Sequence, residues 1–203
     1  MINIKSELPL QRMISKLMNV SELAWGMYAF SRDPLCDKVN DLQKKEMIIK
    51  AIECGKNMSA WTVDYFQTSD PLKIAQQLGL EIVCIEKEQI ANRVLFALFT
   101  PPAKIEIMAE PIQRAAKSCE TMELIPLKTI QKLILGHEIF HFLEEGNPSV
   151  YTRTEKIKLW NFLGFQNYST IQALSEIAGM SFSGYLTPFE TSPFALDVIL
   201  YYN

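Results

Sequence analysis

The sequence is organised around one stretch, Ile134-Leu135-Gly136-His137-Glu138-Ile139-Phe140-His141-Phe142. It contains the pattern His-Glu-x-x-His within apolar residues that favour a helix. Side chains four residues apart on a helix lie on the same face, so His137 and His141 can offer two imidazole nitrogens to one ion. Glu138 follows the first histidine and can reach a water molecule on that ion. The pattern predicts a zinc site with two ligands and a general base.

The histidine content strengthens this prediction. The 203 residues include only 2 His, and both lie in the motif. A chance match needs a rare residue at two fixed positions, which we put at roughly one chain of this length in a few hundred.

Composition excludes several other classes of protein. The chain is 48% hydrophobic, and its 20 basic and 23 acidic residues are interspersed, which gives a net charge of −3 and no basic patch for nucleic acid. The longest apolar run, Val94–Phe99, is far shorter than the ~20 residues of a membrane helix, and the polar stretch Met1–Leu10 is not a secretory signal. The four cysteines have no CxxC spacing. We therefore expect a reduced, cytoplasmic protein without direct contact to membrane or nucleic acid.

Apolar spacing divides the chain into a helical extension, 1–68, and a second domain, 69–203. In the extension, one helical run extends from Leu10 to Met27, Ser31–Pro34 interrupts it, and a second helix covers about Asp41–Phe66. The predicted buried stripe of the second helix is Met47, Ala51, Cys54, Met58, Trp61 and Tyr65. A helix-turn-helix DNA reader is the weaker alternative, because acidic and basic residues balance here.

The second domain is predicted to begin with a short helix and three strands. Asp70 and Pro71 suit the start of the helix, and Gly79 suits its end. The predicted strands are 80–85, 94–100 and 103–109. The last one alternates apolar and charged residues and follows two prolines, which is typical of an edge strand.

Helices are predicted for most of the remaining chain. The His-Glu-x-x-His helix lies between Pro126 and Gly146, and the other helices are expected at 110–122, 155–162 and 170–186. Ser169 is the predicted N-cap of the last of these, and Pro188 stops it. The tail 189–203 is too apolar to remain in solvent, so we expect it to pack on the body or on a partner.

A catalytic zinc usually takes three protein ligands, and because no third histidine exists the third ligand must be sought among carboxylates. The downstream candidates are Glu144, Glu145, Glu155, Glu176, Glu190 and Asp197. Glu144 lies about 10 Å along the helix axis from His137, so it is better placed to hydrogen-bond near His141, or to point to solvent, than to join the ligands. Glu176 lies in the next helix, one and two turns from two small residues that let helices approach closely. The alternative is a solvated glutamate on the polar face of that helix.

The chain resembles the ImmA/IrrE family of bacterial zinc metallopeptidases, a gluzincin-like group, in three segments that occur in the same order: 71–82, 133–143 and 176–188. The resemblance implies that His137, His141 and Glu176 bind zinc and that Glu138 is the general base. It also implies an α+β, mainly helical, zincin-like fold with a small mixed or antiparallel sheet of about three strands. Gly179 stands where the family usually has alanine.

The expected chemistry is hydrolysis of a peptide bond by a metal-activated water, with Glu138 moving the proton. A peptide could add to the strand 103–109 and lie across the zinc. The residues open as oxyanion helpers are Tyr151, Arg153, Tyr168 and Tyr185. The family resemblance implies a narrow protein substrate, such as a DNA-binding repressor.

Two other functions are compatible with the motif. One is a catalytically silent, metal-containing protein-binding module, although a structural site needs no base such as Glu138. The other is a different metallohydrolase, such as a peptide deformylase, which adds a cysteine ligand. Cys119 precedes the motif, but its surroundings do not resemble the deformylase cysteine segment.

Overall fold

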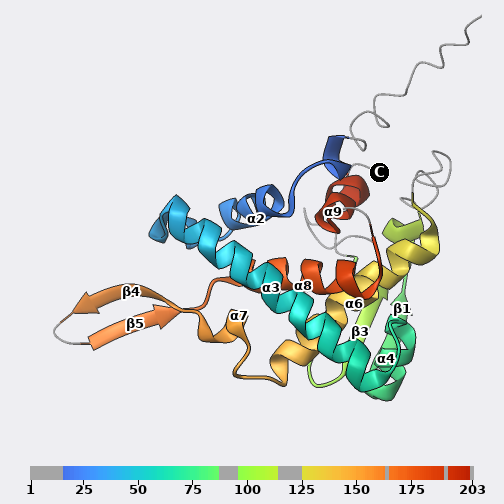
Figure 1. Ribbon diagram of the computed structural model, residues 1–203. Helices are drawn as coiled ribbons and strands as arrows, with labels where there is room; N and C mark the ends of the chain where they lie inside the picture. Colours follow the sequence, from blue (N-terminus) through green and yellow to red (C-terminus); the bar gives the residue numbers. More distant parts are fainter. Residues whose placement is uncertain (1–15, 87–95, 114–124, 163–164, 190–191, 202–203) are drawn as a thin grey trace, which may run out of the picture.

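The computed structural model describes residues 16–86, 96–113, 125–162, 165–189 and 192–201 (Figure 1). Their fold is α+β and mainly helical, with a small mixed sheet of three strands and a separate two-stranded ribbon. Within these residues, no helix combines the length and hydrophobicity that a membrane crossing needs.

The N-terminal part consists of α2 (Glu22–Ser31), a short 3-10 turn η1 (Cys36–Lys38) and the long helix α3 (Asp41–Phe66). Asn40 caps α3, and together with Gln43 it forms a capping box. The predicted break after α2 and the predicted bounds of α3 are confirmed. The predicted run before α2 lies mostly outside the described residues.

The predicted buried stripe of α3 is confirmed at Ala51, but its other positions are displaced by about one residue. Trp61 and Tyr65 are exposed, whereas the buried positions are Ile48, Ala51, Ile52, Gly55, Ser59, Thr62 and Phe66. The reason is close packing on α8 (Gln172–Leu186). A Cβ atom on Gly55 would lie 2.3 Å from the Ala178 carbonyl oxygen, so only glycine fits where these backbones meet.

The helix α4 (Pro71–Gln77) begins at the predicted N-cap Asp70, and Gly79 follows it with a φ of 70°. That left-handed conformation favours glycine. The chain then enters the sheet of β1 (Glu81–Ile85), β2 (Ala97–Thr100) and β3 (Lys104–Met108).

The sheet has the order β1-β3-β2, with β1 parallel and β2 antiparallel to β3. The predicted edge position of β3 is therefore wrong, because this strand lies in the centre. The two prolines that suggested an edge lie in the turn between β2 and β3. Among the described strands, β2 and β1 form the edges.

The His-Glu-x-x-His helix, α6, spans Leu127–Glu145 between Pro126 and Gly146, as predicted. Of the helix predicted at 110–122, residues 109–113 are helical and the rest lies outside the described residues.

The segment between α6 and α8 differs from its prediction. A short helix α7 (Tyr151–Thr154) is followed by the antiparallel strands β4 (Ile157–Phe162) and β5 (Phe165–Ser169), not by a helix at 155–162. Ser169 ends β5 and is not the cap of α8, which begins later, at Gln172. The helix ends at Leu186, before Pro188, as predicted.

One hydrophobic core joins α2, α3, α6 and α8, and includes Phe30, Ile48, Phe140 and Phe182. The tail forms α9 (Phe194–Tyr201), whose first residues Phe194–Leu196 are buried. The predicted packing of the tail on the body is thus confirmed for these residues.

Candidate metal centre

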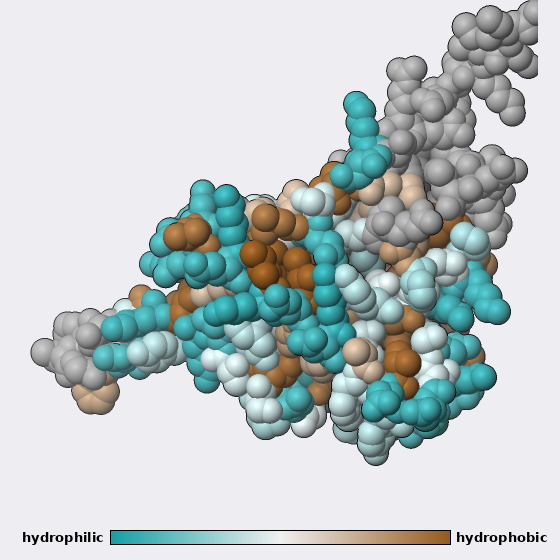
Figure 2. Space-filling model, viewed as in Figure 1, coloured by the Kyte–Doolittle hydropathy of each residue, from teal (hydrophilic) through white to brown (hydrophobic). Residues whose placement is uncertain are grey.

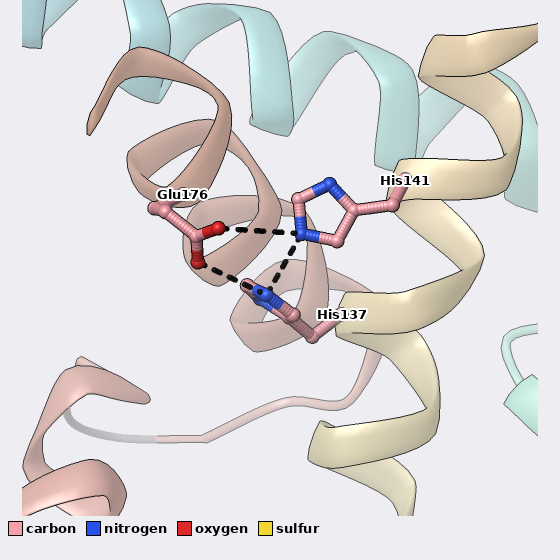
Figure 3. A group of neighbouring side chains, drawn as sticks. All are labelled: His137, His141 and Glu176. Atoms are coloured by element: carbon pink, nitrogen blue, oxygen red, sulfur yellow. Dashed lines mark hydrogen bonds and ion pairs between the residues drawn. The ribbon is translucent and has the colours of Figure 1, made fainter. Parts of the chain in front are cut away.

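The three predicted ligands meet between α6 and α8. His137 and His141 lie one turn apart on α6, and Glu176 reaches both imidazoles from α8 (Figure 3). Each side chain offers one donor atom, and these atoms all lie within 4.8 Å of one another. The structure therefore brings together the residues that sequence reasoning selected.

The spacing of the donor atoms suits a single small cation. The Nε2 atoms of His137 and His141 are 3.0 Å apart. The Glu176 carboxylate oxygens lie 3.4 Å from Nε2 of His137 and 3.9 Å from Nε2 of His141. Tetrahedral zinc with bonds of about 2.0–2.1 Å places its ligand atoms about 3.3–3.4 Å apart. The trio thus fits such an ion with small adjustments of side chains.

Small residues on α8 make this approach of two helices possible. A Cβ atom on Gly179 would lie 3.0 Å from two ring atoms of His137, so glycine leaves room for the imidazole. One turn further on, the Ser183 hydroxyl donates a 2.8 Å hydrogen bond to the Leu133 carbonyl of α6. These contacts hold the helix that carries Glu176 against the helix that carries the histidines.

Glu144 contacts His141 at Nδ1, the ring nitrogen other than the donor atom Nε2. Its Oε2 lies 3.3 Å from Nδ1 of His141 and accepts a 2.6 Å hydrogen bond from Ser175 Oγ, while Thr152 Oγ1 donates to its Oε1. A carboxylate on Nδ1 keeps the proton there and leaves Nε2 free to bind a metal. The predicted hydrogen bond of Glu144 near His141 is confirmed.

Hydrogen bonds also keep Glu144 ionised. Burial alone would raise the pKa of its carboxyl group, but the hydrogen bonds with His141, Ser175 and Thr152 outweigh burial and lower the pKa below its ordinary value. A negative charge behind His141 increases the basicity of the ligating nitrogen.

Glu176 is held as an anion at the front of the site. Its side chain is 52% exposed, but its oxygens lie against two imidazoles. Partial removal of the carboxylate from water would raise its pKa, yet the hydrogen bond and charge of His137, with further contributions from His141 and Arg32, lower it to about 2. An ionised carboxylate is the form that ligates zinc.

The proposed base, Glu138, is fixed by the sheet. Its side chain is 8% exposed, and its Oε2 accepts a 2.7 Å hydrogen bond from the backbone N–H of Phe99 on β2. The backbone N–H of Met108 donates a hydrogen bond to the carbonyl oxygen of Phe96. The backbone N–H and C=O groups of Phe96 and of every second residue after it therefore point towards β3. The backbone groups of Ala97 and Phe99 point outward, towards an edge that no other described strand pairs with. The sheet edge nearest α6 therefore orients the carboxylate that follows His137.

The four residues considered as oxyanion helpers have other environments. Arg153 donates to the backbone oxygens of Glu144 and Glu145 and so caps the end of α6. Tyr168 lies on β5, and Tyr185 lies nine residues after Glu176, on the opposite face of α8. Burial and the neighbouring Glu155 raise the pKa of Tyr151 well above its ordinary value.

Sequence reasoning missed the contribution of the loop after α2. The buried Asp33 accepts a 2.9 Å hydrogen bond from the N–H of Ala173, in the first turn of α8, and another from Leu35. It thus supplies the cap that Ser169 was predicted to provide. The adjacent Arg32 adds positive charge near Glu176. No local pattern shows this, because Asp33 and Ala173 are 140 positions apart.

The other carboxylate candidates are not part of the trio. Glu145 forms an ion pair with Arg153, 3.1 Å between Oε2 and Nη1, and Glu155 is the C-cap of α7. Glu190 and Cys119, the residue considered for a deformylase, lie outside the described residues, and Asp197 is on α9.

Comparisons of the chain with protein-family models, curated proteins and solved structures found no match. The function must therefore be argued from the site itself.

Proposed function

We propose that this chain is a zinc-dependent metallopeptidase with a zincin-like fold. The observation that carries the proposal is the donor set. Two Nε2 atoms and one carboxylate lie at the mutual spacing of zinc ligands, and a carboxylate held by the sheet edge follows the first histidine. Among the described residues this group has three members, and a site with three protein ligands leaves a position for water, as catalytic zinc sites do.

His137, His141 and Glu176 would hold the ion. Bound there, zinc would supply a Lewis acid that acidifies a water molecule and polarises a scissile carbonyl. Glu138 accepts the proton of the attacking water and returns it to the leaving amine. The hydrogen bond from Phe99 keeps one oxygen of Glu138 in place, so the carboxylate needs no reorientation during the reaction. Glu144 keeps His141 in the tautomer that presents Nε2 to the ion.

The peptide strand is assigned to β2 instead of β3. β2 is the edge strand whose outward-facing backbone groups lie beside Glu138, so an extended substrate adding to this edge would pass the general base. The resemblance to ImmA/IrrE peptidases favours a narrow, cytoplasmic protein substrate, such as a DNA-binding repressor.

The test combines metal analysis with peptide cleavage. We expect the purified full chain to contain one zinc ion, measured by atomic emission, and to cleave members of a proteome-derived peptide library, detected by mass spectrometry. Glu138→Gln should retain zinc and lose at least about a hundredfold of the cleavage rate. His141→Ala should lose both zinc and cleavage.

Two results would contradict the proposal in different ways. Cleavage by Glu138→Gln at the wild-type rate would remove the general base from the mechanism. Bound zinc without cleavage of any peptide or co-expressed repressor would favour a metal-containing binding module.

A further inference from the structure

The ribbon of β4 and β5, which we call the arm (157–162 and 165–169), lacks the support that the other strands have. Within the described residues its two strands pair only with each other, and the ribbon projects from the body (Figure 1). An isolated two-stranded ribbon is marginally stable in water. We therefore looked for a surface that could cover it.

One face of the arm is apolar and exposed. Trp160 lies opposite Asn167, and Phe165 is two residues from Asn167, so Trp160 and Phe165 share a face. Trp160 is 50% exposed and Phe165 is 74% exposed. The opposite face carries the pair Lys158 and Tyr168. The visible side of the arm in Figure 2 is mainly hydrophilic, with apolar surface at its lower edge.

A second uncovered apolar surface lies at the C-terminal end of α6. It is a groove of about 740 Å³ between α3, α6 and the turn after β2. Its apolar walls come from Met58, Trp61, Phe99, Pro101, Pro102 and Phe142. Trp61 is exposed and stacks on Tyr65, with ring centroids 5.1 Å apart.

The arm begins beside this groove. Arg153 binds the backbone and carboxylate oxygens of Glu145, and Glu145 and Gly146 line the groove. The chain reaches β4 four residues after Arg153, at Ile157, which packs against the core. The arm then leads away from the body (Figure 1), and none of its described residues lines the groove of its own chain.

We propose that the chain forms a two-fold homodimer in which the Trp160–Phe165 face of each arm lies in the groove of the other copy. In each copy the arm and the groove are neighbours at the C-terminal end of α6. A two-fold axis there would place the arm of each copy in the groove of the other, so that the same contact forms twice. This proposal does not depend on the metal centre.

Area and charge both favour a second copy as the partner. A Trp or Phe side chain buries about 150–250 Å², so the exposed parts of Trp160 and Phe165 offer about 250 Å² per arm. Two arms in two grooves would bury about 1,000 Å², the lower limit for a specific interface, whereas one arm alone would bury about half. Residues 156–170 contain Lys156 and Lys158 and no acidic residue. The remainder of the chain carries a net negative charge, so the basic arm is attracted to a second copy.

The first test measures mass in solution. Sedimentation equilibrium of the full chain should give about twice the monomer mass of 23.2 kDa. The double variant Trp160→Ser/Phe165→Ser should weaken association at least about a hundredfold, because exposed aromatic anchors dominate such interfaces. Tyr168→Ser is the matched control, since it removes an equally exposed aromatic ring from the other face of the arm, and it should leave the dimer intact. Circular dichroism checks that each variant is folded.

The second test places the arm in the groove. A chain with Phe165→Cys mixed with a chain with Trp61→Cys should form a disulfide-linked dimer on mild oxidation, and either variant alone should form none beyond the wild-type background. A monomer at all concentrations, or a dimer unaffected by the double variant, would overturn the proposal. A monomer that needs Trp160 and Phe165 to cleave a protein but not a short peptide would assign the arm to substrate binding instead.

Discussion

The proposed metal centre and the arm lie in one stretch of chain, 126–186, and are supported in opposite ways. The centre is formed by two long helices that pack on each other and on α3, and its carboxylates Glu144 and Glu176 each interact with His141. The arm, between the same two helices, shares hydrogen bonds mainly within itself and presents aromatic rings to solvent. Packing fixes the geometry of the centre, whereas the arm is built to be completed by another surface.

The largest effect should come from filling the space between α3 and α8. In Gly55→Ala the new methyl group would lie 2.3 Å from the Ala178 carbonyl oxygen and 2.8 Å from the Phe182 amide nitrogen. Because backbone atoms cannot give way as a side chain can, we expect the free energy of unfolding in urea to fall by about 3 kcal/mol.

Two control variants test whether this loss of stability is specific to the contact between α3 and α8. Gly146→Ala meets its nearest atoms at 3.8 Å and should be close to neutral. Trp160→Ser, measured at a dilution where the chain is monomeric, should change the unfolding free energy by no more than about 0.5 kcal/mol. A loss as large as that of Gly55→Ala would show that the arm belongs to the cooperative core.

A smaller effect is expected from the glycine beside the first imidazole. In Gly179→Ala the methyl group would lie 3.0 Å from Cε1 and Nδ1 of His137 and would displace the ring by a few tenths of an ångström. Zinc affinity, measured by competition with a chelating dye, should fall about tenfold, as it does when the surroundings of a ligand are disturbed. The control is Gly136→Ala, whose methyl group meets Ser183 at an ordinary 3.4 Å. Equal affinities in the two variants would show that His137 is not constrained from α8.

The smallest effect concerns the pH dependence of the metal-free protein. The pKa of Glu176 falls from 4.5 to about 2 on folding, so its contribution to stability is present above pH 4.5 and is lost as the pH falls towards 2. Between pH 4.5 and pH 2 the free energy of unfolding should therefore fall more steeply with decreasing pH for the wild type than for Glu176→Gln. Some slope should remain in the variant, because the pKa of Glu144 is also lowered.

The arm provides a control for this pH experiment, because it has no carboxylate. No acidic residue occurs in 157–169, so the double variant Trp160→Ser/Phe165→Ser should keep the wild-type pH slope as a monomer. A wild-type slope in Glu176→Gln would mean that the imidazoles do not hold the ionised carboxylate.

The sequence predicted most of the centre because its determinants are local. The spacing of His137 and His141, the stops at Pro126 and Gly146, and the small residues after Glu176 are all visible within single helices. Because the chain has no third histidine, six downstream carboxylates stayed open as the third ligand, and the resemblance to ImmA/IrrE peptidases implied Glu176. What could not be predicted came from distant contacts: Asp33 capping α8, and Phe99 holding Glu138.

The first strand of the arm was predicted to be part of a helix, at 155–162, because its strand pattern is interrupted. The pairing register shifts between Lys158 and Trp160, so that Leu159 is an extra residue and the alternation of apolar and polar positions is lost there. In α3 the error was different: Trp61 and Tyr65 were chosen for their hydrophobicity, but close contact with α8 needs a glycine at position 55. Hydrophobic periodicity cannot report how closely two backbones must approach.

The hydrogen bond from Ala173 to Asp33 has a consequence for protein engineering. The proposed ligand Glu176 stands one turn beyond an amide whose hydrogen bond is accepted by a residue of the loop after α2. A shortened chain that begins at α4 would present Glu176 on a helix with an unsatisfied first turn, and would expose the face of α8 that α3 covers. Transplanting this centre into another scaffold would therefore require the segment from Arg32 onward, or a new acceptor designed opposite Ala173.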